Sequence, residues 1–507
     1  MTDRPTRREI IRAGGASAAG IALLGAGCDS SSKPAATAAA KPRPIKRATA
    51  PPGALNVVVF ICDSMRVDHA YGPRARMETL DRLATQGLRF TRVRPEAMPT
   101  IPARRSIMTG HRIFPFRHWH PYEGLPPQPG WEPVGHERQM WTQVLQREGW
   151  TTGYVTDNPH LLAKVHDRFR AKFDRAEVVV GQVPLRRKPT RPVSQDELYK
   201  HLPPVLRGSR AEPRMKAYLS ANPRGRDEQD FLAPRVHRKA MDWLDWAKTR
   251  QPFALVVDNF DAHEPWDAPP NLIDIYDTPT TPGVEPIQPF PTPAAQWRKE
   301  GLSPALVRRM SHLYAAEMTM VDRWVGHTLA KLENLGLADK TVVVLISDHG
   351  VLLGEYGWVG KRYTELHHEL THVPFLIRHP EGKAKGVSSR YFASTHDVGP
   401  TVLSMLGFDR PHSMNGADVS VLLDGKKPPA RRYYVSAYTD HVMAGDGRWH
   451  LIANNQGGEK RLYDLKRDPH ERHNVAARYP QHANRLWRAI VRQAGGPLPK
   501  FKISSPG

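Results

Sequence analysis

Residues 55–63 spell L-N-V-V-V-F-I-C-D, an unbroken apolar run of strand length that ends in an aspartate. A strand that is apolar on both faces is typical of a parallel sheet covered by helices on each side. Three further apolar runs, at 152–157, 253–258 and 341–348, each follow a stretch with helical spacing. One more apolar run, at 373–378, comes soon after the last of these. This alternation predicts an α/β fold with a mostly parallel central sheet between helices.

The sequence changes character after about residue 425, where short alternating runs replace the long apolar ones. The runs Y-Y-V-S-A-Y, R-W-H-L-I-A and R-L-Y-D-L precede a helical stretch near Asn484 to Gln493. We therefore expect a main domain over 53–425 and a small C-terminal antiparallel α+β subdomain over 426–507.

Two proline-rich stretches interrupt the α/β pattern. Residues 184–226 are basic as well as proline-rich, and we expect an insertion over the surface, either a solvated loop or part of the substrate rim. Residues 267–303 are expected to be loop-like, and neither stretch carries a recognisable specificity motif.

The first 28 residues are predicted to be an export signal. Arg7 and Arg8 precede a weakly apolar run that ends at Cys28, a pattern typical of a twin-arginine signal. Cys28 is a candidate lipid-attachment cysteine, although Gly25 stands where such motifs prefer leucine. Residues 29–52 are expected to be a disordered tether. The predicted location is the cell envelope, with lipid anchoring on the outer face of the cytoplasmic membrane left open.

Charge and cysteine content narrow the classes of function. The net charge of +22 suits an anionic substrate or an anionic membrane surface. No helix-turn-helix, zinc-finger or RNP-type pattern accompanies this charge, so a specific nucleic-acid target is not expected. The only two cysteines, Cys28 and Cys62, exclude a disulfide framework.

Aspartates stand at the ends of three of the apolar runs, namely Asp63, Asp258 and Asp348. Ligands of open α/β sheets bind beyond the carboxyl ends of the strands, so these carboxylates are expected at one edge. Together with His349 and the oxygen of Thr100, Asp63 and Asp348 would form a mixed oxygen and nitrogen site for a divalent cation. For each aspartate taken alone, a turn or helix-cap role is the favoured interpretation, and only the combination points to a metal site.

Residues 98–110, M-P-T-I-P-A-R-R-S-I-M-T-G, place a hydroxyl at a predicted helix start. Thr100 would lie where backbone N–H groups and the helix dipole favour anions. Arg104, one turn later, would lie on the same helix face and could hold the charge of the attacked group. The alternative is a helix-capping threonine followed by a solvated arginine.

Basic side chains near the predicted strand ends are candidates for contacting the substrate. His263 lies in F-D-A-H-E-P-W and could protonate a leaving oxygen, and Lys361 could bind the oxygens of a tetrahedral anion. His367, His368 and His372 are weaker candidates, of which His372 is the predicted substrate contact.

The order of these motifs resembles the sulfatase family of the alkaline phosphatase superfamily over residues 55–490. The motifs that carry the resemblance are the strand ending in Asp63, then T-L-D-R-L-A-T-Q-G-L-R-F, T-I-P-A-R-R-S-I-M-T-G, G-Y-V-T-D, F-D-A-H-E-P-W, S-D-H-G-V-L-L-G-E-Y-G, V-G-K and L-Y-D-L-K-R-D-P-H-E-R-H-N. The resemblance implies an alkaline phosphatase-like fold and a sulfatase-like catalytic domain over 53–425. It also implies roles for single residues: Asp63, Asp348 and His349 hold the metal, Thr100 is the nucleophile, Arg104 orients it, and Lys361 and His263 contact the substrate anion and the leaving group.

Three departures from the family pattern bear on the chemistry. Sulfate-cleaving members carry Cys or Ser, oxidised to formylglycine, at the position of Thr100, whereas superfamily phosphodiesterases and phosphoethanolamine transferases with threonine there form a phosphothreonine. Ser64 stands where many sulfatases have a further metal-binding aspartate. Asp258 and His263 are five residues apart, whereas the corresponding pair of two-metal phosphodiesterases is four apart. We therefore expect one divalent ion (Ca, Mn, Mg or Zn), with a second left open.

The expected function is hydrolysis of a phosphate or sulfate ester by way of a covalent intermediate on Thr100, with phosphoryl chemistry favoured. The substrate would be an anionic small molecule or a glycan or lipid ester. One alternative is a transferase that moves a phosphoryl-type group to an envelope glycan or lipid. Another is a non-catalytic lipoprotein that binds anions in the same pocket, with peripheral attachment through Cys28.

Overall fold

The computed structural model describes residues 47–136, 138–181, 191–209, 211–222, 226–276, 285, 287 and 294–501. The predicted signal over 1–28, with Arg7, Arg8 and Cys28, lies outside the described residues, as does the tether up to residue 46.

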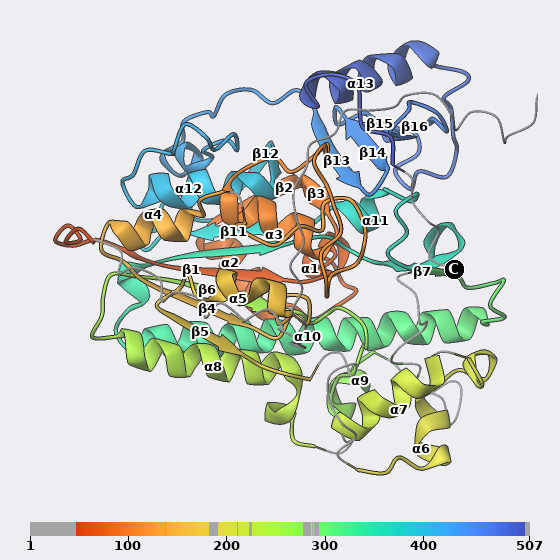
Figure 1. The fold of residues 1–507 in the computed structure, drawn as a ribbon, viewed down its shortest axis with the longest axis horizontal. Helices are drawn as coiled ribbons and strands as arrows, with labels where there is room; N and C mark the ends of the chain where they lie inside the picture. Colours follow the sequence, from red (N-terminus) through yellow and green to blue (C-terminus); the bar gives the residue numbers. More distant parts are fainter. Residues whose placement is uncertain are drawn as a thin grey trace, which may run out of the picture. The chain divides into compact units, whose positions relative to one another are not determined.

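Eight strands form the central sheet, and Figure 1 shows helices above and below it. In spatial order the strands are β12 (Val387–Ser394), β2 (Leu88–Arg94), β11 (Phe375–Arg378), β8 (Thr341–Ser347), β1 (Asn56–Cys62), β6 (Phe253–Asn259), β4 (Thr151–Thr156) and β5 (Arg175–Val178). Every pairing is parallel except the two made by β11, which runs antiparallel to β8 and β2. The α/β fold with a mostly parallel central sheet is confirmed.

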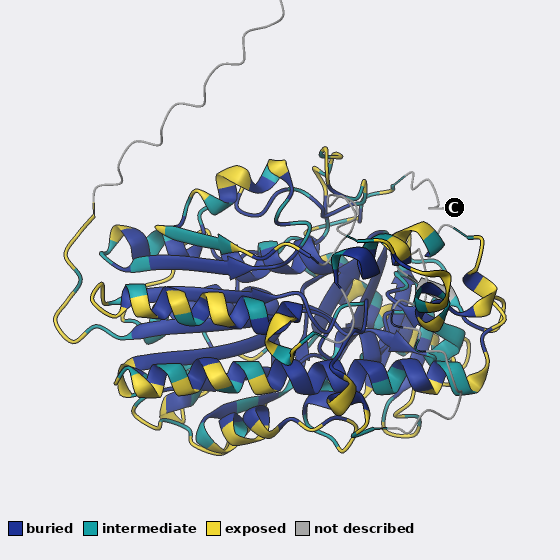
Figure 2. Ribbon diagram, turned by 90° about the horizontal axis from the view of Figure 1, so that it is seen from below, coloured by how far each residue is buried: buried dark blue, intermediate teal, exposed yellow. Residues whose placement is uncertain are grey.

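Strand β1 is buried on both faces, as its unbroken apolar run predicts. Val58 and Phe60 pack in one layer with α2 (Glu78–Gln86), α8 (Leu232–Ala247) and α10 (Pro304–Asn334), whereas Val57 and Val59 pack in the opposite layer. That second layer holds α3 (Thr100–Thr109), α4 (Trp141–Arg147) and α12 (Val398–Met405). Figure 2 shows the central strands as buried, whereas the helices expose their outer faces.

A separate sheet carries the C-terminal strands. Its order is β16 (Arg461–Asp464), β15 (Trp449–Asn454), β14 (His441–Gly445), β13 (Tyr434–Tyr438) and β3 (Ala97–Met98), and α13 (Pro480–Gln493) packs on β14 and β15. The last four strands of the chain are antiparallel, as expected, but β3 joins them in parallel with β13, with Met98 opposite Tyr438. Strand β3 thus ties the segment before Thr100 to the C-terminal sheet.

The remaining elements are short and complete the connections. A third sheet contains β7 (Ala294–Gln296), β10 (Trp358–Gly360) and β9 (Leu352–Leu353). The other helices are α1 (Val67–Ala70), α5 (Asp167–Arg170), α6 (Gln195–His201), α7 (Ala211–Ala221), α9 (Pro270–Ile273) and α11 (His368–Thr371). No described helix is long and apolar enough to cross a membrane.

One prediction about the proline-rich stretches needs correction. A solvated loop over 184–226 is wrong for its described part, because α6 and α7 form there and bury Leu198, Met215 and Leu219 in the main core. The stretch 267–303 contains α9 and β7 as well as loop.

Candidate active site

Parallel pairing brings the predicted carboxylates to one edge of the sheet. Cys62 of β1 lies opposite Ser347 of β8, so Asp63 and Asp348, the next residues, leave neighbouring strands at the same level. Asp258 is the penultimate residue of β6, on the other side of β1, where it pairs with Ile61. All three aspartates are fully buried.

Arg104 joins these three carboxylates. Its guanidinium lies 3.0 Å from Asp63 Oδ2, 2.6 Å from Asp258 Oδ1 and 2.6 Å from Asp348 Oδ2, and all four side chains are 0% exposed. Burial alone would lower the pKa of Arg104, but the three negative charges outweigh burial and raise it well above its usual value. The alternative of a solvated arginine is therefore wrong.

Thr100 is the first residue of α3, where the sequence predicted a helix start. The residue is 2% exposed, and its carbonyl accepts a hydrogen bond of 3.2 Å from Arg104 Nη1. The helix ends at Thr109, and it is capped by Gly110, whose φ of 63° and close neighbours Pro400 and Met414 leave no room for a Cβ. Thr100 thus lies at the positive end of a ten-residue helix, held to the carboxylate cluster through Arg104.

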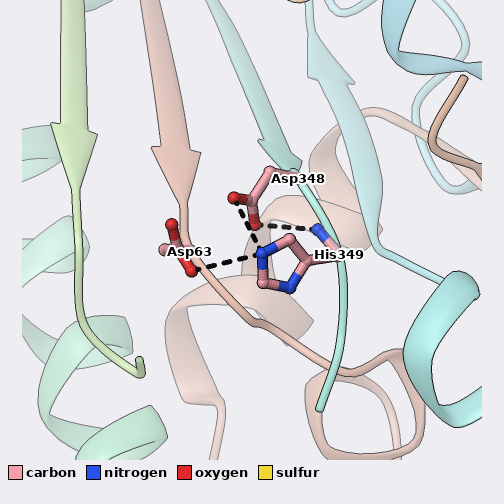
Figure 3. A group of neighbouring side chains, drawn as sticks. All are labelled: Asp63, Asp348 and His349. Carbon is pink, nitrogen blue, oxygen red and sulfur yellow. Dashed lines mark hydrogen bonds and ion pairs between the residues drawn. The ribbon is translucent and has the colours of Figure 1, made fainter. Parts of the chain in front are cut away.

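Asp63, Asp348 and His349 form a group that could hold a metal ion (Figure 3). One ligand atom from each lies within 4.8 Å of the others. His349 Nδ1 donates to the carbonyl of Gly350 at 2.8 Å, so in the neutral ring Nε2 carries the lone pair. This buried Nε2 has no hydrogen-bond partner among the described residues and lies 3.4 Å from Asp348 Oδ2 and 3.7 Å from Asp63 Oδ1. The residues present therefore fit a divalent cation.

Electrostatics at this group also fit a cation. Burial and the neighbouring charge of Asp348 raise the pKa of Asp63 well above its usual value. Burial would raise the pKa of Asp348 too, but His349 and Arg104 outweigh it and lower the pKa to about 2. Burial lowers the pKa of His349, which favours the neutral ring that a metal needs.

Ser64 donates hydrogen bonds to the carboxylates of Asp63 and Asp348, a role that the sequence did not reveal. Its N–H donates to Asp348 Oδ1 at 3.0 Å and its hydroxyl donates to Asp63 Oδ1 at 2.8 Å. The backbone of Ser64 has a φ of 57°, and its carbonyl accepts a hydrogen bond from the hydroxyl of Tyr314 at 2.8 Å. Tyr154, from the G-Y-V-T-D motif, likewise supports the site by donating to Asp258.

His263 and Lys361 lie together beside the carboxylate cluster. Lys361 is near enough to lower the pKa values of Asp63 and His349, and His349 in turn helps to lower the pKa of His263. The His263 ring stacks on Phe260 at 4.1 Å between centroids and contacts the carbonyl of Glu264 through Nδ1 at 2.8 Å. Burial lowers the pKa of His263 to about 3, so its ring is neutral at pH 7.

Glu264, which the sequence interpretation passed over, contacts Lys361 with both carboxylate oxygens. The Lys361 ammonium lies 2.8 Å from Glu264 Oε1 and 2.7 Å from Oε2. Burial would raise the pKa of Glu264, but His263 and Lys361 outweigh it and lower the pKa to about 2. The signal in the sequence was the position of Glu264 directly after His263.

The weaker histidine candidates are engaged in other contacts. His367 lies between Glu365 and Glu471, and His368 lies 3.3 Å from Glu471. His372 is half-buried, and its Nε2 donates to the carbonyl of Thr91 at 3.1 Å. A substrate contact by His372 stays a prediction.

Two models of known protein families match this chain. The family model described as Sulfatase matches residues 55–408, and the model described as N-sulphoglucosamine sulphohydrolase, C-terminal, matches residues 354–493.

Relatives with matching sequences are sulfatases. The N-acetylglucosamine-6-O-sulfatase of Bacteroides thetaiotaomicron is 30% identical over 175 residues, which are 32% of this chain and 31% of that protein. An arylsulfatase of Clostridium perfringens is 23% identical over 54% of this chain and 60% of its own length. The ulvan-active sulfatase of Formosa agariphila is 24% identical over 83% of this chain and 76% of its own length. The chain thus covers less than two thirds of the length of the first two relatives.

Solved structures of similar fold include two phosphonate monoester hydrolases. The one from Silicibacter pomeroyi has a TM-score of 0.66 at 19% identity, covering 87% of this chain and 95% of its own. The one from Agrobacterium radiobacter has a TM-score of 0.61 at 19% identity, covering 87% and 96%. At this identity the likeness bears on the fold, and it supports the expected alkaline phosphatase-like architecture.

Proposed function

Because the chain belongs to the sulfatase family, we propose that it hydrolyses a phosphate or sulfate ester by way of a covalent intermediate on Thr100. The observation that carries the proposal is the arrangement around Arg104. This guanidinium bonds the carbonyl of Thr100 at the start of α3 and also pairs with Asp63 and Asp348, two members of the candidate metal group.

Asp63, Asp348 and His349, with the hydroxyl oxygen of Thr100, would hold one divalent ion. Such an ion would lower the pKa of the threonine hydroxyl and offset charge on the attacked group. The ion would be Ca, Mn, Mg or Zn, and a site with a second ion is the alternative.

The reaction forms a bond from Thr100 Oγ to phosphorus or sulfur and breaks the bond to the leaving oxygen. Water then cleaves the threonine ester and regenerates the hydroxyl. Lys361 would bind the non-bridging oxygens. The neutral ring of His263 offers a lone pair on Nε2, which can accept a proton and return it to the leaving oxygen. This donation requires a pKa higher than about 3, and a bound anion beside the ring would raise it.

We favour phosphoryl over sulfuryl transfer because of Thr100. A hydrated formylglycine expels sulfate through its second hydroxyl, whereas threonine has only one and its oxidation would give a ketone. A threonine phosphate must instead be released by attack of water. The names of the relatives favour a second candidate, a sulfate ester of a glycan, since they include an N-acetylglucosamine-6-O-sulfatase and an ulvan-active sulfatase.

The envelope location also stays a proposal. We propose export through the twin-arginine signal with Arg7 and Arg8, and lipid attachment at Cys28. Replacing both arginines with lysine should keep the protein in the cytoplasm, and Cys28→Ala should release it from membranes. Transfer to an envelope glycan or lipid and binding without catalysis are the alternatives to hydrolysis.

A parallel assay tests the hydrolase proposal. The purified chain is assayed on nitrophenyl sulfate, nitrophenyl phosphate, a nitrophenyl phosphodiester and a nitrophenyl phosphonate ester, each with Ca, Mg, Mn or Zn. Faster turnover of the phosphodiester or phosphonate ester supports phosphoryl chemistry. Dominant turnover of the sulfate ester would overturn that preference, and no turnover of any ester would favour transfer or binding.

A further inference from the structure

Glu264 forms an ion pair with Lys361 and so neutralises the ammonium that is proposed to bind the substrate anion. Both side chains are largely buried, with Lys361 5% and Glu264 11% exposed. Each carboxylate oxygen is within hydrogen-bond distance of the ammonium, at 2.8 and 2.7 Å. A buried charge that is paired in this way has no remaining charge to offer to a second anion at low energetic cost.

A second carboxyl, that of Glu317 near Glu264, does not supply the negative charge beside Lys361. Burial and the nearby charges of Asp261 and Glu264 raise the pKa of Glu317 well above its usual value, which favours the neutral form of this group. Glu264, by contrast, stays ionised. The negative charge beside Lys361 is therefore that of Glu264.

The charges of Arg104, Lys361 and their carboxylate partners can be added up to give the net charge of the site. Arg104 pairs with Asp63, Asp258 and Asp348, and Lys361 pairs with Glu264. A bound divalent ion would keep Asp63 ionised like the other three, and these four carboxylates would then exceed the two cationic side chains by two charges, which that ion balances. The site would then be neutral before substrate enters, so each additional negative charge on the substrate is poorly compensated.

We propose that Glu264 is a specificity-determining residue that sets the site for singly charged esters over the doubly charged phosphate monoesters. The favoured class comprises sulfate monoesters, phosphate diesters and phosphonate monoesters, each of which carries one negative charge at neutral pH. This proposal rests on the proposed function, in which Lys361 contacts the substrate anion. Glu264 also contacts His263 Nδ1, through its carbonyl at 2.8 Å and its carboxylate at 3.5 Å, and the backbone contact survives substitution of the side chain.

Phenyl sulfate and phenyl phosphate are matched probes, because they share their shape and differ by one charge at pH 8. Their dissociation constants are measured by calorimetry with excess Ca²⁺, in the full chain carrying Thr100→Ala so that no turnover occurs. Adding Glu264→Gln removes the charge and keeps the shape of the side chain. Glu264→Asp keeps the charge and is the matched control.

Glu264→Gln should shift the ratio of the two dissociation constants about tenfold or more in favour of phenyl phosphate, whereas Glu264→Asp should leave the ratio within about threefold. Lys361→Met should shift the ratio in the opposite direction, and this second variant serves if Glu264→Gln does not fold. An unchanged ratio in Glu264→Gln, an unchanged ratio in Lys361→Met if Glu264→Gln does not fold, or no binding of either ligand would overturn the proposal. If the ratio shifts but the unmodified chain hydrolyses no ester, only the proposed function fails.

Discussion

Replacing Arg104 with glutamine should strongly lower the free energy of unfolding of the protein. The guanidinium is fully buried and lies 2.6–3.0 Å from three carboxylates that are also fully buried. Removing one partner of a buried ion pair costs about 3–5 kcal/mol, because the remaining charge is left uncompensated. Here three carboxylates lose their partner, so we expect a loss of at least about 4 kcal/mol in the free energy of unfolding.

Urea unfolding of Arg104→Gln, Arg104→Lys and the matched control Arg105→Gln measures this loss. Lysine keeps the positive charge, but its single ammonium cannot contact all three carboxylates as the planar guanidinium does. We therefore expect Arg104→Lys to lower the free energy of unfolding by about 2 kcal/mol. Arg105 pairs with Glu132 nearer the surface, and Arg105→Gln should cost about 1 kcal/mol or less. Excess Ca²⁺ should stabilise Arg104→Gln more than the unmodified chain, because the cation offsets the same carboxylates. A loss below about 1 kcal/mol in Arg104→Gln would refute this reasoning.

Three further predictions concern the metal, acid stability and the support of Asp258. Asp348→Asn should lower the bound metal in elemental analysis whereas Asp258→Asn, outside the candidate metal group, should retain it; equal metal contents would contradict the ligand assignment. Burial lowers the pKa of His237 to about 3 from 6.5, so only the unfolded chain binds its proton between these values and stability falls as the pH drops below about 6.5. His237→Gln should therefore lose about 2 kcal/mol less than the unmodified chain between pH 7.5 and pH 5 in urea titrations, and identical losses would contradict this. Tyr154→Phe removes the hydrogen bond to Asp258 and should cost about 1 kcal/mol, and an unchanged urea midpoint would argue against that bond.

The long apolar strands could be predicted from the sequence because burial on both faces leaves an unbroken run, as in β1. Strand β2 has no such run, because arginine and threonine interrupt the apolar residues of L-R-F-T-R-V-R without a strict alternation. The direction of β11 was also beyond reach, since an apolar run has the same composition whichever way the strand points.

Some residues of the candidate site could likewise be predicted from local sequence, and others could not. Asp63, Asp348 and Thr100 could be found because strand ends and a helix start place them by local rules. The partners of Glu264 and Ser64 could not, since Lys361 is 97 residues from Glu264 and Asp348 is 284 residues from Ser64. Such pairings depend on how distant loops pack, which no local pattern encodes.

Intact-mass analysis of the enzyme quenched during turnover tests the central claim most directly. The unmodified chain and Thr100→Ala are each mixed with the best nitrophenyl ester, quenched in acid within the first turnovers, and mapped by peptide mass. We predict the added mass of one phosphoryl or sulfuryl group on the peptide that contains Thr100, and neither this adduct nor turnover in Thr100→Ala. Turnover by Thr100→Ala at the unmodified rate, or an adduct on another residue, would contradict the account.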